Sequence, residues 1–377
     1  MRLNWLREVV RAAGPFATVY LDGSHQDPGA TQAIELAWRD ARAGLRSDGA
    51  DEATLGALDD VVASIARAER RDPGWTGWLL VAAEGTVRLC RALPHAPDPP
   101  RARWAMVPDV LPALIELPEP VELVLAVVDA QGAEISVGQH VRQLDTGRHP
   151  LHPVHGGGLA HLPMRRRVEE NQRASARRVA HALEAEVSNV GGDLLVLAGE
   201  TQSRSRVYRE LTGRARAVVE QAEHGGRAPG SDDDALAEEV ARLVDGRIAD
   251  ERRTAFERWQ RHAGGHEHMA VEGLQPVFDA FQAGLVDALY LDPSALAGRE
   301  AWIGAEPGQV SAVPEPLLEL GLCASGPVPS ADALVRAAAG TGSTLHLLDE
   351  EGADLVERRP VDGVGAILRA ETAGGTG

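Results

Sequence analysis

One stretch decides the fold: a glycine segment, His155-Gly156-Gly157-Gly158-Leu159-Ala160-His161, leads into an arginine-rich one, Arg165-Arg166-Arg167-Val168-Glu169-Glu170-Asn171-Gln172-Arg173. Three consecutive glycines favour no single backbone conformation, so the first segment predicts a mobile, solvent-exposed loop. The second predicts a long helix that ends at Gly191-Gly192, because glycine often follows the last turn of a helix.

The predicted helix has two different sides. Apolar residues recur at helical spacing and are expected to pack on a core: Val168, Ala176, Val179, Leu183 and Val187. Arginines fall on the other side: Arg166, Arg173 and Arg177, with Arg167 and Arg178 extending that face; Arg165 begins the basic run. A loop mounted on a basic helix suits a protein that enters a phosphate-lined site. The alternative is an ordinary loop and a solvated charged surface, since charge runs are weak indicators of function.

Composition limits the possible partners. The chain has 377 residues, enough for two or three domains, and a formal net charge of −18. That charge argues against a protein that coats nucleic acid by bulk attraction, so any RNA contact must be local. All 38 basic residues are arginine, the better residue for bidentate phosphate contacts.

The two cysteines, Cys90 and Cys323, lie far apart and suit a reducing compartment. The sequence shows no cleavable apolar leader and no run long enough to span a membrane. We therefore expect a cytoplasmic protein that has neither a membrane nor DNA as a partner.

Strand and helix patterns predict an α/β chain with mixed sheets and three domains, at residues 1–117, 118–263 and 264–377. Proline- and glycine-rich segments mark the boundaries, at Pro118-Glu119-Pro120 and Ala263-Gly264-Gly265. In the first domain we expect helices at 4–13, 30–46, 55–70 and 107–115, a strand at 16–21 and a hairpin over 75–91.

In the second domain we expect strands at 121–129, 133–137, 141–144, 193–198 and 217–221, the basic helix, and helices at 203–211 and 232–260. In the third we expect helices at 271–283 and 329–339, strands at 286–291, 343–347 and 361–369, and a loop-rich segment at 307–316. Ser330 is the predicted cap of the 329–339 helix, and Gly340 its predicted end.

Three motifs carry a resemblance to a known family. They are Phe16-Ala17-Thr18-Val19-Tyr20-Leu21-Asp22, Gly157-Gly158 followed by Arg166-Arg167-Val168-Glu169, and Asp362-Gly363-Val364-Gly365-Ala366-Ile367-Leu368-Arg369. With the layout of the whole chain, they resemble bacterial relatives of archaeo-eukaryotic peptide release factors and Pelota. The chain is most similar to the actinobacterial branch that includes the Balon-like ribosome hibernation factors.

The resemblance implies an RNase H-like middle domain, as in release factor domain two. It implies an α/β/α last domain like those of ribosomal RNA-binding proteins, and a first domain peculiar to the bacterial group. It also implies a ribosome-binding translation factor that enters the vacant A site and acts in the stress response. Its partners would be ribosomal RNA and the elongation factor that delivers transfer RNA, and no cofactor is expected.

The sequence departs from the family at one point that matters. Release factors carry Gly-Gly-Gln on the central loop, whereas Leu159 follows the glycines here and no glutamine lies between Gln143 and Gln172. The resemblance therefore implies a hibernation factor without peptide release. Its site would contain His155, Gly156, Gly157, Gly158, Leu159, His161, Arg165, Arg166, Arg167, Arg173 and Arg177, with no catalytic residue among them.

Two enzymatic alternatives remain. His155 or His161 could replace the glutamine as a base in a peptidyl-tRNA hydrolase or a termination or rescue factor. Asp129 and Glu200, which follow strands, could hold magnesium in a nuclease. Two observations argue against the nuclease. Such metal sites need three or four carboxylates, and a turn at Asp129 with a helix cap at Glu200 would account for the presence of these two acidic residues.

Two further motifs have ordinary explanations. The segment containing His262, His266, Glu267 and His268 invites a metal site, but it is glycine-rich and its histidines would not share a helical face. The glycines before the basic helix lack the Lys-Ser/Thr of a nucleotide-binding loop. Binding of an RNA phosphate at the start of that helix is an alternative that the sequence leaves open.

Overall fold

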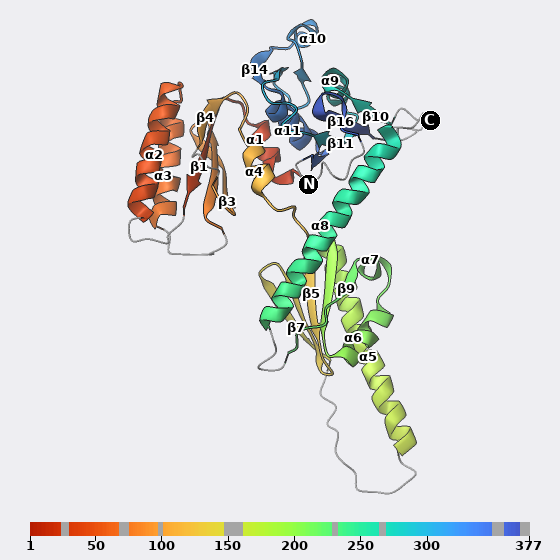
Figure 1. Cartoon of the computed structure of the whole chain (residues 1–377). Coiled ribbons are helices and arrows are strands. Elements are labelled where there is room, and N and C mark those ends of the chain that lie inside the picture. Colours follow the sequence, from red (N-terminus) through yellow and green to blue (C-terminus); the bar gives the residue numbers. More distant parts are fainter. Residues whose placement is uncertain are drawn as a thin grey trace. The chain divides into compact units, whose positions relative to one another are not determined.

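The computed structural model describes residues 1–23, 30–67, 75–96, 101–146, 161–227, 233–263, 269–348 and 358–369, and side chains of 161–168 are outside this description. The chain divides into two compact units. The first unit contains residues 1–118 and 252–377, and the second contains residues 119–251 (Figure 1). The division into three domains stays a prediction.

The N-terminal part of the first unit is an antiparallel sheet in the order β3-β2-β1-β4. Its strands are β1 (Phe16–Asp22), β2 (Gly77–Ala83), β3 (Thr86–Leu93) and β4 (Ala102–Ala105). Helices α2 (Ala30–Ser47) and α3 (Glu52–Arg67) pack on one face, against alternate residues of β1 that include Ala17 and Val19. The other face presents Phe16 and Tyr20, because successive strand residues point to opposite sides.

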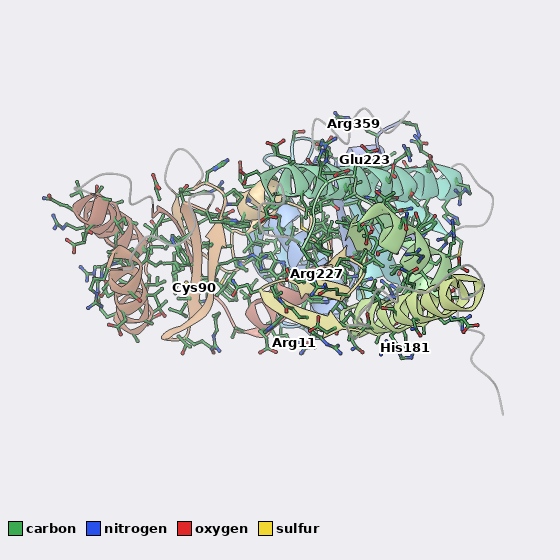
Figure 2. The ribbon with its side chains drawn as sticks, turned by 90° about the horizontal axis from the view of Figure 1, so that it is seen from below. Arg11, Cys90, His181, Glu223, Arg227 and Arg359 are labelled. Carbon is green, nitrogen blue, oxygen red and sulfur yellow. The ribbon has the colours of Figure 1, made fainter. Side chains whose placement is uncertain are left out.

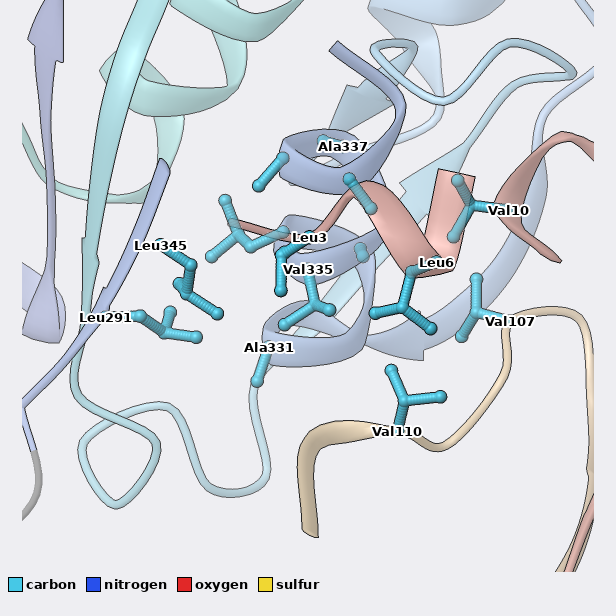
Figure 3. Packing of buried hydrophobic residues seen from close by; sticks show 14 of the residues in the cluster. Leu3, Leu6, Val10, Val107, Val110, Leu291, Ala331, Val335, Ala337 and Leu345 are labelled. Atoms are coloured by element: carbon cyan, nitrogen blue, oxygen red, sulfur yellow. The ribbon is translucent and has the colours of Figure 1, made fainter. Parts of the chain in front are cut away.

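That second face shares a hydrophobic cluster with segments from both ends of the chain (Figure 3). The N-terminal contributions come from η1 (Asn4–Leu6), α1 (Arg7–Arg11) and α4 (Leu111–Glu116). The C-terminal contribution includes α11 (Ser330–Thr341), which is buried along most of its length. Leu6, Val110 and Val335 are each at most 1% exposed in this cluster, so the two ends of the chain form one core.

The C-terminal part has a four-stranded sheet in the order β10-β16-β11-β15. Its strands are β10 (Ala270–Glu272), β16 (Val364–Leu368), β11 (Val286–Leu291) and β15 (Thr344–Leu347). Helices α9 (Leu274–Gln282) and α11 pack on one face. Phe256 and Trp259 of α8 (Asp233–Ala263) pack on the other face against Tyr290 and Ile367. The predicted α/β/α arrangement is therefore confirmed, with the end of α8 as its third layer.

Short regular elements lie within and on either side of residues 307–316, the segment expected to be loop-rich. A three-stranded sheet has the order β13-β12-β14, with β12 (Glu300–Ile303), β13 (Val310–Ser311) and β14 (Ser325–Pro329), and α10 (Glu315–Glu319) lies between the last two. The turn η2 (Val361–Gly363) precedes β16. Runs this short give too little periodicity to be recognised in a sequence.

Both predicted ends of α11 are wrong. The residue before the helix is Pro329, and no side chain caps it; Ser330 is already helical, and its hydroxyl is buried without a hydrogen-bond partner among the described residues. The helix passes Gly340 and ends at Gly342, which adopts the left-handed conformation at φ 75°. Gly340 is needed for a close contact instead, since a Cβ there would lie 2.1 Å from the Pro307 Cβ.

The second unit is a five-stranded sheet in the order β7-β6-β5-β8-β9. Its strands are β5 (Leu123–Val128), β6 (Gly132–Val137), β7 (His140–Asp145), β8 (Leu194–Gly199) and β9 (Val219–Gln221). The first three form an antiparallel meander, whereas β5, β8 and β9 run parallel. This is the strand arrangement expected of an RNase H-like sheet, so the fold class predicted for this segment is confirmed.

Helices cover both faces of this sheet. One face carries α5 (His161–Val190), α6 (Thr201–Glu210) and α7 (Gly213–Ala217), with Val179 and Leu183 in the core. The other face is covered by the first part of α8, through residues such as Leu236. Alternate strand residues separate the two cores: Leu195 and Leu197 face α5, whereas Val196 and Ala198 face α8.

Candidate functional site

The predicted site lies partly outside the described residues. Five of its residues lie outside the described part of the chain: His155, Gly156, Gly157, Gly158 and Leu159. His161, Arg165, Arg166 and Arg167 belong to the described backbone of α5, but their side chains are not described. The structure therefore gives side-chain positions for Arg173 and Arg177 of the predicted set.

The described part of α5 has the two sides that its sequence predicts. Ala176, Val179, Leu183 and Val187 are at most 5% exposed and lie in the core of the unit. Arg173 and Arg177 have side chains that are 67% and 61% exposed. The side chain of Val168 lies outside the described residues. The outward position expected for these two arginines is confirmed.

Arg173 and Arg177 share one carboxylate. The Nε of Arg173 donates to one oxygen of Glu210 at 3.0 Å, and the Nε of Arg177 donates to the other at 2.9 Å. The Arg177 hydrogen bond, followed by that of Arg173, lowers the pKa of Glu210. Because two guanidinium groups face one carboxylate, a positive charge remains on this surface.

Thr146, the last described residue before the glycine segment, is tied to α5. The Arg178 guanidinium donates to the Thr146 carbonyl at 2.5 Å, and the Ser175 hydroxyl bonds to the Thr146 hydroxyl. Thr146 also bonds through its amide and its hydroxyl to the Gln131 carbonyl, at 2.8 and 2.9 Å. These contacts fix the end of β7 against the middle of α5.

A shallow hollow, open to solvent, lies between α5, α6 and the carboxyl end of β5. Its lining is mixed: Asp129, Ala130, Gly132, Gln172, Ser175, Ala176, Val179, Ser203, Arg206 and Val207. Ligand sites of open α/β sheets lie at the carboxyl ends of parallel strands, and β5 and β8 are parallel. The position and the hydroxyl, amide and guanidinium groups suit a polar ligand.

Asp129 has a structural role in this hollow. One of its carboxylate oxygens accepts from the amides of Gln131 at 2.7 Å and Gly132 at 2.9 Å, and closes the β5–β6 turn. The same oxygen accepts from Arg227 at 2.9 Å, and Arg227 also reaches Asp145 at 3.4 Å. Arg227 is labelled in Figure 2. The turn predicted at Asp129 is confirmed.

Glu200 precedes α6, but its side chain makes no cap to a backbone amide. It accepts instead from the Ser203 hydroxyl at 2.8 Å. Within the described ranges, no three histidine, cysteine, aspartate or glutamate side chains are grouped so that they could hold a metal ion. His262 lies in the last turn of α8, whereas His266, Glu267 and His268 lie outside those ranges. Cys90 and Cys323 are both exposed free thiols.

Sequence reasoning missed a second group of arginines. Five arginines and one glutamate lie between Thr201 and Ala217, on α6 and α7: Arg204, Arg206, Arg209, Arg214 and Arg216. These arginines are nearly as closely spaced in the sequence as those of the basic helix, so the sequence could have indicated them. What the spacing alone could not give is the contact of α6 and α7 with α5.

The fold of the second unit defines a class: an α/β/α sandwich with an RNase H-like sheet and a basic helix on one face. Residues 122–265 match the sequence profile of bacterial archaeo-eukaryotic release factor family 2. The resemblance to release factor relatives is therefore confirmed, and the match locates it in the middle of the chain.

Two curated relatives span the chain as a whole. They are the uncharacterized proteins MT2704 and Rv2629 of two Mycobacterium tuberculosis strains, each 29% identical over 375 residues, which is 98% of this chain and 97% of the relative. No helix within the described ranges has the length and apolar character that crossing a membrane requires.

Three solved structures illustrate the similarity to release factors and Pelota. Ribosome-bound archaeal Pelota with ABCE1 is 16% identical, with a TM-score of 0.42 over 80% of this chain and 75% of that one. Saccharomyces cerevisiae Dom34 is 10% identical, with a TM-score of 0.37 over 66% and 63%. The archaeal termination factor aRF1 is 14% identical, with a TM-score of 0.24 over 98% and 97%.

Proposed function

We propose that this protein is a ribosome-associated translation factor that occupies the vacant A site of idle ribosomes and protects them. The observation that carries the proposal is the outward, incompletely neutralised arginine pair Arg173 and Arg177 on α5. This helix belongs to the segment that matches the release factor family. Guanidinium groups on an exposed face suit RNA phosphates, which they bind with two parallel hydrogen bonds.

The proposed factor does not release peptides. Glutamine is missing from the glycine segment, where Leu159 follows Gly158. In the proposed orientation this segment points toward the peptidyl transferase centre, and Arg165, Arg166 and Arg167 hold RNA phosphates together with Arg173 and Arg177. The elongation factor that delivers transfer RNA is a proposed partner, and ribosome binding would place the protein in the cytoplasm during stress.

Cosedimentation with empty 70S ribosomes tests the proposal. We expect the full chain to pellet with ribosomes at moderate salt, and Arg173→Gln with Arg177→Gln to weaken that binding. The matched control is Arg242→Gln with Arg247→Gln, which removes two arginines from α8 on the opposite face of the sheet. A wild-type chain that stays in the supernatant overturns the proposal. Equal losses in the two double variants overturn the role of α5.

A further inference from the structure

Helices α5, α6 and α7 form one continuous layer on the sheet of the second unit. Val207 and Leu211, from α6 and the residue that follows it, and Ala215 of α7 point into the same core as Val179 and Leu183 of α5. Helix α5 contacts both shorter helices. We call these three helices the basic layer, because their sequences contain eleven arginines and five glutamates.

Most of the basic-layer arginines whose side chains are described have no carboxylate within ion-pair distance. Eight of them have described side chains: Arg173, Arg177, Arg178, Arg204, Arg206, Arg209, Arg214 and Arg216. Three have a carboxylate within ion-pair distance: Arg173 and Arg177 with Glu210, and Arg214 with Asp193 at 3.6 Å. The other five have no carboxylate partner among the residues that the structure describes.

The two arginines of α7, Arg214 and Arg216, are also positioned by their surroundings. The Arg216 guanidinium lies 3.5 Å from the centre of the Tyr208 ring and donates to the Tyr208 carbonyl at 2.7 Å. Arg214 donates to the carbonyls of Gly191 and Gly192 at the end of α5. Arg209 is exposed, and Arg206 lines the hollow between α5 and α6. Because Arg214 and Arg216 are held in place, they lose little entropy on binding an anion.

The opposite face of the same sheet has the opposite charge. The part of α8 in the second unit, residues 233–251, contains seven acidic residues and two arginines, Arg242 and Arg247. Its apolar residues cover the sheet through Leu236 and its neighbours. A polyanion is therefore attracted to one face of this unit and repelled by the other.

We propose that the basic layer as a whole, including α6 and α7, binds folded RNA through its phosphates. This deepens the proposed function, on which it rests, because it extends the RNA contact beyond α5. A membrane-binding surface would combine cations with exposed apolar side chains. No large exposed hydrophobic residue lies among the described side chains of α5, α6 and α7.

A labelled RNA duplex of about 16 base pairs is the probe, since such a length presents phosphates across two grooves. Fluorescence anisotropy is measured with the wild-type chain and with Arg206→Gln plus Arg209→Gln. We expect the double variant to bind about tenfold more weakly, with the slope of log K against log salt shallower by about two. Arg242→Gln plus Arg247→Gln on α8 is the matched control and should bind like the wild type.

Three results overturn the inference: no duplex binding by the wild type, equal weakening in both double variants, or tighter binding to anionic phospholipid vesicles, polyglutamate or a DNA duplex than to RNA. An unchanged melting temperature verifies that the variants fold. The two proposals fail separately. A wild type that binds the duplex as expected but does not sediment with 70S ribosomes removes the ribosomal function alone. A wild type that sediments without binding the duplex removes the RNA surface alone.

Discussion

The indole ring of Trp259 lies directly against the backbone of Gly365. A Cβ at residue 365 would be 2.2 Å from Cη2 of Trp259, closer than any real contact. Trp259 comes from the last part of α8, and Gly365 from the closing strand β16. Packing therefore explains Gly365 of the closing motif, because a residue without a Cβ leaves room for the indole ring against the sheet.

We predict that Gly365→Ala destabilises the first unit by about 1–3 kcal/mol, the usual cost of overpacking a core. Urea unfolding followed by tryptophan fluorescence measures the change. Gly56→Ala is the matched control: Gly56 lies inside α3 with nothing within 4 Å of an added Cβ. It should stabilise the protein by about 0.5–1 kcal/mol, because alanine favours the helix. Equal effects of the two substitutions would contradict this account.

We predict that Glu210→Gln leaves ribosome binding intact or strengthens it. The substitution removes the one carboxylate that both Arg173 and Arg177 contact, so two guanidinium groups become available to phosphate. Cosedimentation across a salt series measures the effect, with Glu184→Gln on α5 as the control. Glu184 bonds to Thr212 and to no arginine among the described contacts. Weaker binding by Glu210→Gln alone would count against a phosphate role for the pair.

We predict that the protein releases no peptide from stalled ribosomal complexes above background. The reason is chemical: the glycine segment has no glutamine to place a water molecule on the ester. Release of labelled peptide from peptidyl-tRNA measures this. Release by the wild type that disappears in His161→Ala would establish the hydrolase alternative in place of the proposed function.

A buried acid, Asp332, makes a contribution to the stability of the first unit that falls as pH rises. Burial and the nearby charge of Asp109 raise the pKa of Asp332 to about 7, although Arg103 at 3.2 Å favours the charged form. The ordinary pKa is 3.8, so the folded state keeps this proton where the unfolded chain has lost it. The resulting stabilisation is complete below about pH 4 and is lost as pH rises through about 7.

Urea midpoints at about pH 5 and about pH 8 measure this effect. On going to the higher pH, the wild type should lose more stability than Asp332→Asn, because the variant has no proton to release at this position. Part of the loss should persist in the variant, because burial also raises the pKa of Asp109. An identical pH dependence in the two proteins would rule out Asp332 as its source.

Asp129→Asn separates the structural role of this residue from a nuclease. The carboxylate accepts two turn amides and Arg227, so we expect a loss of stability of about 1–3 kcal/mol. We expect no magnesium-dependent RNA cleavage by either protein. Cleavage by the wild type that is absent in Asp129→Asn would revive the nuclease hypothesis. Thermal unfolding and a gel-based cleavage assay provide the two measurements.

The sequence itself determined most elements with strong periodicity. The two sides of α5, the buried strands β5 and β8 and the long helix α8 follow from local spacing of apolar residues. Short elements such as β4 and β13 escaped prediction, because two to four residues give no period and depend on their neighbours. The C-terminal end of α11 was mispredicted for a similar reason. Gly340 lies inside the helix because Pro307 packs against it, and this contact cannot be seen in the local sequence.

Only the tertiary structure decided which distant residues meet. Sequence spacing placed arginines on α5, but it could not bring Glu210 between Arg173 and Arg177, nor unite α5, α6 and α7 into one layer. It predicted a glycine-led closing strand without indicating that Trp259 requires Gly365. The physical reason is range: periodicity records which side of an element is apolar, whereas charge pairing and close packing depend on elements that are far apart in the chain.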